Sequence, residues 1–163
     1  MKVFHGSTVS VAAPLVGIGR KNLDFGKGFY TTMLAEQAER WATIKKERSN
    51  APKAIVSIYE IDVALLTDAA LHIREFHGVD EAWLNFVVGC RKENAPNHEF
   101  DLVFGPVAND NVFLTVNLYE TGAIDVMAAI AQLRAYRTYD QLSFHTERVV
   151  AALRFVESYE VKG

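Results

Sequence analysis

The sequence predicts a single domain of the α+β class. Strand and helix patterns do not alternate strictly along the chain, and several strand patterns are short and separated by loops. No G-x-G-x-x-G motif follows a strand in the arrangement of a dinucleotide-binding fold, and no Walker A motif is present. Because the 163 residues include no internal repeat and no linker of biased composition, we expect one domain over residues 1–163.

The chain begins with two short strand patterns and a helix pattern. Residues 2–5 form the first strand, which ends at Gly6 and Ser7, and residues 29–32 form the second, shortly after two glycines. Residues 34–48 carry apolar side chains at helical spacing with charged residues between them, which predicts an amphipathic helix.

The elements after this helix are strands and helices of varied length. Residues 54–61 have apolar side chains on both faces, which predicts a strand that is covered on both sides. Thr146 is a natural N-cap for a short helix near the end of the chain. The further predicted elements are a helix at 80–88, a strand at 101–104, a helix at 124–136, a strand at 138–145, a helix at 146–153 and a strand at 154–161.

The composition is that of an ordinary globular protein, with 50% hydrophobic and 23% charged residues, so disorder is not indicated. A net charge of -3 argues against a broad surface for nucleic-acid backbones, although local contacts to phosphate stay open. The N-terminal residues lack the apolar core of a signal peptide, and no apolar run approaches the length of a membrane span. We therefore expect a cytoplasmic protein with no membrane association.

Disulfide and metal chemistry are not expected. The single cysteine, Cys90, cannot form an internal disulfide, and one cysteine with five scattered histidines gives no zinc spacing. We expect Cys90 to be a small buried apolar side chain and not a nucleophile.

The first segment that can carry chemistry is Phe4-His5-Gly6-Ser7, at the end of the opening strand. Glycine has no Cβ, so a ligand can closely approach the backbone beside the His5 imidazole. Such a site can bind a flat amide or a ribose hydroxyl. The alternative is a histidine that only hydrogen-bonds a neighbouring carbonyl.

The second segment comprises residues 24–32, DFGKGFYTT. Gly26 and Gly28 allow a tight loop that brings the rings of Phe29 and Tyr30 to the start of a strand. Aromatic faces suit a planar cationic heterocycle such as the nicotinamide ring of NAD. The alternative is a β-bulge with aromatic core residues.

The third segment is the strand pattern between Tyr139 and Thr146. Strand alternation sends Leu142 and Phe144 to one face, and Gln141, Ser143 and His145 to the other. The apolar pair is expected to face the core. Three polar groups in line can form the sugar-binding wall of a cleft, and a plain solvated sheet face fits the same spacing.

Together, these three segments and their order resemble the ADP-ribosyltransferase superfamily. In that family a His-Gly-Ser/Thr strand, a glycine-preceded aromatic strand with Tyr, and a late strand with Glu or Gln form the NAD pocket. More narrowly, the chain resembles the small bacterial group called DUF3990. The resemblance implies a split β-sheet core with flanking helices, and it is carried by residues 4–7, 24–32, 37–42, 101–110 and 140–146.

The resemblance implies a role for individual residues of this chain. His5 would hydrogen-bond a ribose hydroxyl of NAD, Gly6 would offer its backbone to the nicotinamide carboxamide, and Tyr30 would stack on the nicotinamide. Residues 25–29 would close over the ligand. The implied catalytic residues are His5, Tyr30 and Gln141, and the implied ligand-binding residues are Gly6, Ser7, Arg20, Asp24, Phe25, Gly26, Gly28, Phe29 and Ser143.

Two of these ligand-binding residues carry a charge. Asp24 would fix the loop that closes over the ligand. Arg20 would contact a phosphate, because guanidinium matches phosphate geometry, and its alternative role is that of a solvated loop arginine.

Gln141 stands where many members of the resembled family have glutamate. Cleavage of the nicotinamide–ribose bond passes through an oxocarbenium-like state, which a carboxylate near the ribose 2′-OH stabilises by charge and by hydrogen bonding. Glutamine keeps only the hydrogen bond. If the lost charge costs about 3 kcal/mol, the rate falls by about a hundredfold. Glutamine cannot act as a general base, for which Glu147, Asp140 and His145 are the candidates.

The sequence thus predicts an NAD-dependent mono-ADP-ribosyltransferase that acts on an unknown macromolecule. The resemblance also implies a bacterial toxin with a possible antitoxin protein as its partner. An alternative is a non-catalytic module that binds NAD or ADP-ribose, suggested by Gln141 in place of glutamate. A third is an interaction domain with a degenerate pocket. The negative net charge disfavours a nucleic-acid acceptor.

Overall fold

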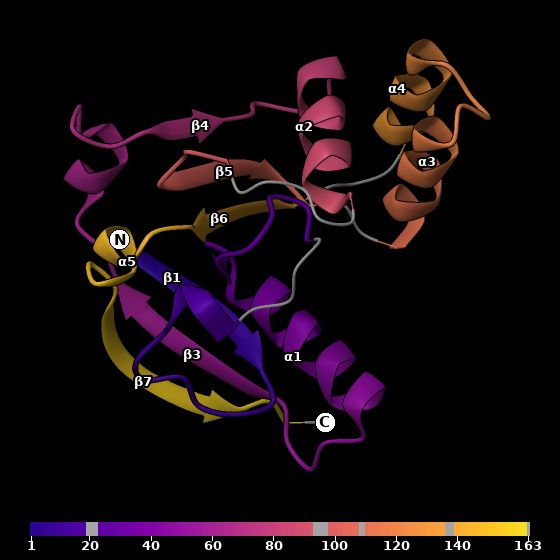
Figure 1. The fold of residues 1–163 in the computed structure, drawn as a ribbon. Coiled ribbons are helices and arrows are strands. Elements are labelled where there is room, and N and C mark those ends of the chain that lie inside the picture. The colour runs from indigo at the N-terminus through magenta and orange to yellow at the C-terminus, as the bar shows by residue number, and fades with distance from the viewer. Residues whose placement is uncertain (19–22, 93–97, 108–109, 136–138, 163) are drawn as a thin grey trace.

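Two β-sheets meet at one seam in the computed structural model, which describes residues 1–18, 23–92, 98–107, 110–135 and 139–162 (Figure 1). The first sheet is antiparallel, in the order β1-β3-β7, with β1 at Lys2–Ser7, β3 at Ile55–Glu60 and β7 at Arg154–Glu160. The second has the order β2-β6-β5-β4, with β2 at Phe29–Thr31, β6 at Asp140–Phe144, β5 at Leu102–Pro106 and β4 at Ile73–Glu75. Only its β4–β5 pair is parallel. A β-bridge between Phe4 and Thr32 joins the sheets at this seam.

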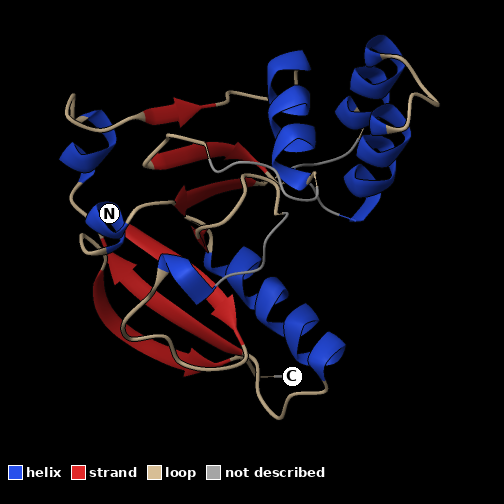
Figure 2. Ribbon diagram, viewed as in Figure 1, coloured by secondary structure: helices blue, strands red, loops and turns tan. Residues whose placement is uncertain are grey.

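Helices cover the outer sides of both sheets (Figures 1 and 2). The longest packs against β1 and β3, whereas the next three lie beside the second sheet. The prediction of an α+β domain is therefore confirmed. The described α-helices are α1 at Ala35–Ser49, α2 at Glu81–Arg91, α3 at Asp110–Glu120, α4 at Val126–Arg134 and α5 at Glu147–Val150, with 3-10 turns at Val16–Ile18 and Val63–Thr67.

Several helices begin or end at residues with a clear local reason. Asp80 and Asp125 are N-caps whose carboxylates accept hydrogen bonds from the backbone N–H groups of Trp83 and Ala128, each at 2.8 Å. At its C-terminus, α1 ends with Asn50 in the left-handed conformation, at φ 51°.

The apolar residues form three clusters that separate the layers. One lies between the two sheets and includes Tyr59 and Leu142, a second joins the second sheet to α2, α3 and α4, and a third lies between α1 and the first sheet. In β3, Tyr59 belongs to the first cluster and Val56 to the third. The prediction that residues 54–61 form a strand covered on both faces is confirmed.

Gly6 is the point where α1 comes closest to the first sheet. A Cβ placed on Gly6 would lie 2.1 Å from the backbone oxygen of Ala38 and 2.8 Å from the backbone nitrogen of Ala42. Both atoms belong to the helix backbone, which cannot move aside as a flexible side chain can. The glycine is therefore needed for packing of the helix on the strand, whatever its role toward a ligand.

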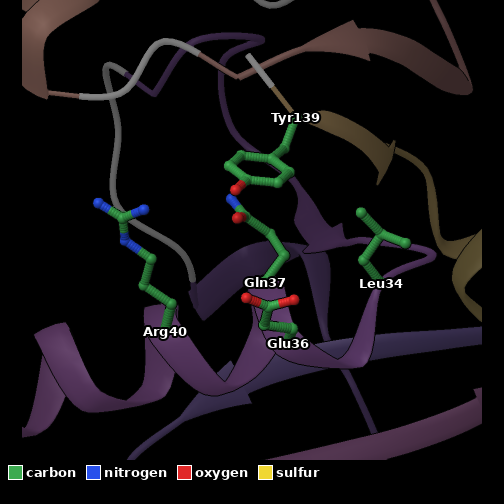
Figure 3. Close-up of a pocket in the computed structure, with 5 residues that line it drawn as sticks. All are labelled: Leu34, Glu36, Gln37, Arg40 and Tyr139. Atoms are coloured by element: carbon green, nitrogen blue, oxygen red, sulfur yellow. The ribbon is translucent and has the colours of Figure 1, made fainter. Parts of the chain in front are cut away.

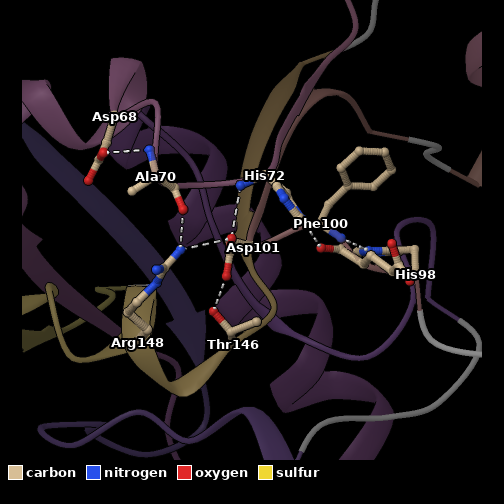
Figure 4. A network of polar contacts seen from close by, with 9 residues as sticks. Asp68, Ala70, His72, His98, Phe100, Asp101, Thr146 and Arg148 are labelled. Atoms are coloured by element: carbon tan, nitrogen blue, oxygen red, sulfur yellow. Dashed lines mark hydrogen bonds and ion pairs between the residues drawn. The ribbon is translucent and has the colours of Figure 1, made fainter.

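Asp101, directly before β5, connects the residue before β4 with the start of α5 (Figure 4). Its carboxylate accepts hydrogen bonds from the backbone N–H of His72 at 2.9 Å, the hydroxyl of Thr146 at 2.7 Å and the guanidinium of Arg148 at 3.2 Å. Burial raises the pKa of Asp101, but these donors and the charge of Arg148 outweigh it, so its pKa lies below the usual value. Thr146 is the N-cap residue of α5, as predicted, yet its hydroxyl binds Asp101 and makes no cap bond.

The described elements differ from the predicted ones at several places. α3 and β4 correspond to no predicted element, and the helix predicted at 146–153 is shorter, at Glu147–Val150. Within the described residues, no helix combines the length and the apolar character that crossing a membrane requires.

Candidate functional site

The His5 imidazole lies at the seam between the sheets. Its Nδ1 is 2.7 Å from the backbone oxygen of Tyr30, and its ring stacks on Phe29 with centroids 4.4 Å apart. Burial, together with the charge of Lys45, lowers the pKa of His5 to about 3, so the ring is neutral at physiological pH. Because a carbonyl oxygen only accepts, Nδ1 carries the proton, and Nε2 is left as an acceptor. No partner of Nε2 is found among the described residues.

The Tyr30 hydroxyl holds the preceding loop. It donates to the backbone oxygen of Gly26 at 2.5 Å and accepts from the backbone N–H of Phe25 at 3.1 Å. Burial, with the nearby carboxylate of Asp24, raises the pKa of Tyr30 well above its usual value. The hydroxyl therefore stays protonated and fixes the loop's backbone.

Gln141 lies on the same sheet face as Tyr30. In the β2–β6 register Tyr30 pairs with Ser143 and Thr31 with Leu142, so the side chains of Tyr30, Ser143 and Gln141 point the same way. Gln141 is 4% exposed, and its Nε2 is buried without a hydrogen-bond partner. Because the Gln141 side chain is buried, it does not lie on a solvated sheet face, which was the alternative that the sequence allowed. A buried amide N–H without a partner is costly, and among the described residues the one other buried side-chain donor in this state is Nη1 of Arg91.

The His5 ring and the Tyr30 ring lie on opposite sides of β2. Phe29, on which His5 stacks, belongs to the cluster between the sheets, whereas Tyr30 packs against the cluster beneath α2. Adjacent residues of a strand point to opposite faces. The structure thus brings His5, Tyr30 and Gln141 to one seam, but it does not place all three side chains on one face.

Ser143 and His145 hold the loop from β6. The Ser143 hydroxyl is 2.7 Å from Nε2 of His145, whose Nδ1 is 2.8 Å from the backbone oxygen of Lys27. Burial, followed by the neighbouring His98, lowers the pKa of His145 to about 4. Gly28 passes so close that a Cβ would lie 2.7 Å from Nδ1 of His145. Ser143, a predicted ligand-binding residue, is fully buried and acts here on a neighbouring side chain.

Two residues that sequence reasoning missed, Arg91 and His98, also hold the loop of residues 24–28. The Arg91 guanidinium forms an ion pair with Asp24, with Nε 3.0 Å from Oδ1. His98 accepts from Phe100 through Nδ1 and therefore donates through Nε2 to the backbone oxygen of Phe25, at 2.7 Å. No spacing in the sequence connects these residues, because 67 and 73 positions separate the bonded partners.

The aromatic side chains of Phe25 in the loop and Phe29 in the adjacent strand β2 are buried in the core, and Gly26 lies in the turn between them. Phe25 is fully buried, with its centroid 6.1 Å from that of Phe76, and Phe29 is 6% exposed. Gly26 has a φ of +79°, which favours glycine. In this structure both rings are core residues, whereas the described β2–β6 pairing is regular and shows no β-bulge.

Two further predicted site residues, Gly6 and Ser7, lie in β1. Ser7 ends β1, half-buried, and pairs with Ile55. Gly6 faces α1 with its α-carbon, and its backbone oxygen accepts a hydrogen bond from Lys45 at 2.6 Å. Arg20 lies outside the described residues.

A small pocket lies between the start of α1 and the residue that precedes β6 (Figure 3). Tyr139 continues the ladder of β6, since its backbone oxygen accepts from Val107 at 2.7 Å, so its side chain points to the face of Gln141. The pocket measures about 60 Å³, far below the roughly 300 Å³ or more of a typical small-molecule site. Its lining residues are Leu34, Glu36, Gln37, Arg40 and Tyr139.

Neither cysteine chemistry nor a metal centre is indicated in the part of the chain that the structure describes. Burial, with a contribution from Asp24, raises the pKa of the Cys90 thiol to about 11, so it stays protonated at neutral pH. The described residues contain no group of three or more metal-ligating side chains.

One comparison with known proteins gave a match. The model of a family described as "Protein of unknown function (DUF3990)" matches residues 1–155. No curated protein and no solved structure matches the chain.

Proposed function

We propose, on the premise that the chain belongs to the DUF3990 family, that it is an NAD-dependent mono-ADP-ribosyltransferase. It would cleave the nicotinamide–ribose bond of NAD and transfer ADP-ribose to a macromolecule. One observation carries the proposal: the amide of Gln141 is buried without a partner, on the face of Tyr30 and at the seam where His5 bonds Tyr30. A buried donor without a partner is explained most simply by a ligand that accepts its hydrogen bond.

The polar groups at the seam match a ribose. Nε2 of Gln141 donates, and Nε2 of neutral His5 accepts. A ribose hydroxyl both accepts and donates, so it can satisfy either group. His5 and Gln141 lie on opposite faces of the sheet at β2, and a dinucleotide carries two riboses, one for each of these groups. The aromatic face of Tyr30 supplies a surface for a planar ring.

The chemistry needs little from the protein beyond position and hydrogen bonding. The C1′–N bond breaks, its electron pair leaves with the nicotinamide, and the positive charge passes to the ribose ring. Gln141 supports this state by a hydrogen bond to the ribose but lacks the charge of a carboxylate. We therefore expect a slow enzyme, about a hundredfold below a glutamate-bearing one.

The loop of residues 24–28 contributes preorganisation. Tyr30, His98 and His145 bond its backbone, and Arg91 from α2 bonds the side chain of Asp24. A loop that is already ordered loses little entropy when a ligand binds beside it.

Incubation with NAD labelled in the adenylate part, together with a bacterial lysate, tests this function. We expect labelled macromolecules and released nicotinamide with the native chain, and a loss of both with His5→Ala. His77→Ala is the matched control, because the His77 side chain is 84% exposed and lies outside the site. If the native chain releases no more nicotinamide than His5→Ala, the protein is not a transferase.

A second candidate function is a module that binds NAD or ADP-ribose without turnover. The observation that favours it is the amide at position 141, which binds a ribose as well as a carboxylate does but stabilises the transition state less. Titration calorimetry with NAD separates the two functions. Binding without nicotinamide release supports the module, whereas absence of binding removes both candidates.

We further propose a bacterial, cytoplasmic toxin whose activity an antitoxin protein restrains, as the resemblance implies. Induced expression of the native chain in bacteria should arrest growth, and expression of His5→Ala should not. Equal growth of the two strains would contradict a toxic activity.

A further inference from the structure

We propose that the pocket at the start of α1, lined by Leu34, Glu36, Gln37, Arg40 and Tyr139, receives a carboxylate side chain of a protein acceptor. This inference rests on the proposed function and names the class of group that the transferase modifies. None of the residues assigned to NAD above lines this pocket.

The position of the pocket places it beside the proposed reaction site. Tyr139 and Gln141 point to the same face of β6 and its extension. Thr32, directly after β2, links β6 to the start of α1: its hydroxyl donates to the backbone oxygen of Asp140 at 3.3 Å and accepts from the N–H of Leu34 at 3.2 Å. Figure 3 shows the Tyr139 ring over the Gln37 side chain, with Arg40 extending beside them. A group in this pocket lies next to the row that holds Gln141.

The electrostatics of the pocket favour an anion. The Arg40 guanidinium is exposed and forms no ion pair with any described residue. The first turn of the 15-residue α1 contributes Glu36 and Gln37 to the pocket lining, and Leu34 supplies no side-chain cap for the backbone N–H groups of that turn. Glu36 opposes this preference, but it lies in the first turn of α1, where a carboxylate compensates the helix dipole.

The identity of Gln141 makes an anionic acceptor chemically suitable. A hydroxyl or guanidinium acceptor must lose a proton, and glutamine is no base. A carboxylate is already deprotonated at neutral pH. Its oxygen lone pair forms the bond to C1′ as the C1′–N bond breaks, and the electron pair of that bond leaves with neutral nicotinamide. The product is an ester, and no proton has to be removed.

A protein carboxylate fits better than a nucleic-acid phosphate. A volume of about 60 Å³ holds a small group and not a nucleotide. The chain has a net charge of -3 and so lacks the basic surface that holds a nucleic-acid backbone.

The test uses the full chain with labelled NAD and a lysate, and it measures nicotinamide release and macromolecule-linked ADP-ribose separately. We expect the linked label to reside in protein and to be released by neutral hydroxylamine, which cleaves an ester at its carbonyl carbon. Arg40→Glu should lower the ratio of linked to free ADP-ribose at least about tenfold, the effect of one charge-assisted hydrogen bond. Nicotinamide release, with water as the acceptor, should persist in this variant.

Two further variants on α1 serve as comparisons for Arg40→Glu. Arg48→Glu, two turns further along α1 and exposed, should leave the ratio unchanged. Glu36→Gln should raise it, because the variant removes the carboxylate that opposes an anion in the pocket. Hydroxylamine-resistant label, label in nucleic acid, an unchanged ratio in Arg40→Glu, or loss of transfer in Glu36→Gln would each overturn the carboxylate assignment while the transferase stands. No nicotinamide release from the native chain would instead remove the proposed function itself.

Discussion

The imidazole of His5 donates a hydrogen bond of 2.7 Å to the backbone oxygen of Tyr30, and so a side chain of one sheet is joined to the first strand of the other. The bond fixes the tautomer of His5 and leaves Nε2 as an acceptor. It thus serves the fold and prepares the proposed binding group at the same time. Variants at this position should therefore change both stability and ligand binding.

His5→Ala should lower the free energy of unfolding by about 1–3 kcal/mol, because it removes a buried hydrogen bond and the stack on Phe29. Urea unfolding at pH 7 measures this change. His5→Asn can keep a donor toward the Tyr30 carbonyl and should recover part of the stability. Equal stability of the native chain and both variants would show that the bond contributes nothing to the seam.

Stability should fall as the pH drops below about 6.5, because His5 and His145 remain neutral in the folded state. Both have a lowered pKa, about 3 and about 4, so the unfolded chain binds their protons first. In this window each histidine should reduce the free energy of unfolding by about 1.4 kcal/mol per pH unit. Urea unfolding at pH 6, 5 and 4.5 tests the slope, and His145→Gln should reduce it. A stability that is flat between pH 6.5 and 4.5 would contradict burial of the neutral rings.

Gln141→Met should stabilise the unliganded protein by about 1 kcal/mol, because it removes a buried amide donor that has no partner. The same variant should lose NAD binding in calorimetry. Gln141→Glu should raise nicotinamide release by up to about a hundredfold while it lowers stability, since it buries a carboxylate. If Gln141→Met binds NAD like the native chain, the amide takes no part in the site.

Arg91→Met should lower the free energy of unfolding by about 3 kcal/mol, because the side chains of Arg91 and Asp24 are each only 11% exposed and Asp24 would lose its charged partner. Thermal unfolding measures this loss. The double variant Arg91→Met with Asp24→Asn should recover a large part of it, as expected for a coupled pair. Arg74→Met, at an exposed arginine, is the control. Additive losses in the double variant would show that the ion pair is not the cause.

The sequence was sufficient for elements whose local pattern and packing agree. α1 was predicted because its apolar positions follow helical spacing, and its buried residues Ala38 and Ala42 lie on that face. α3 was missed because its sequence, DNVFLTVNLYE, contains several β-branched and aromatic residues that have no strong helix propensity. Its helical form depends on Val112 and Val116, which are fully buried in the cluster shared with α2 and α4. Tertiary packing therefore decides its structure.

The candidate site was predictable only in part for the same reason. His5, Tyr30 and Gln141 stand in segments with recognisable local patterns, and the structure brings those segments to one seam. Arg91 and His98 act on the loop through partners that are distant in sequence, so no motif marks them. The sequence also could not predict on which face of β2 the His5 ring lies, because this depends on how the two sheets meet.

The loop of residues 24–28 is synthesised early but is completed by the end of the chain. Its bond to Arg91 spans 67 residues, its bond to His98 spans 73, and its bond to His145 spans 118. Contacts of such high sequence separation form late in folding, because the entropy of closing the intervening chain must be overcome first. A nascent chain therefore cannot assemble this loop until residues 140–145 have left the ribosome, and no N-terminal fragment that stops before them can carry the complete site.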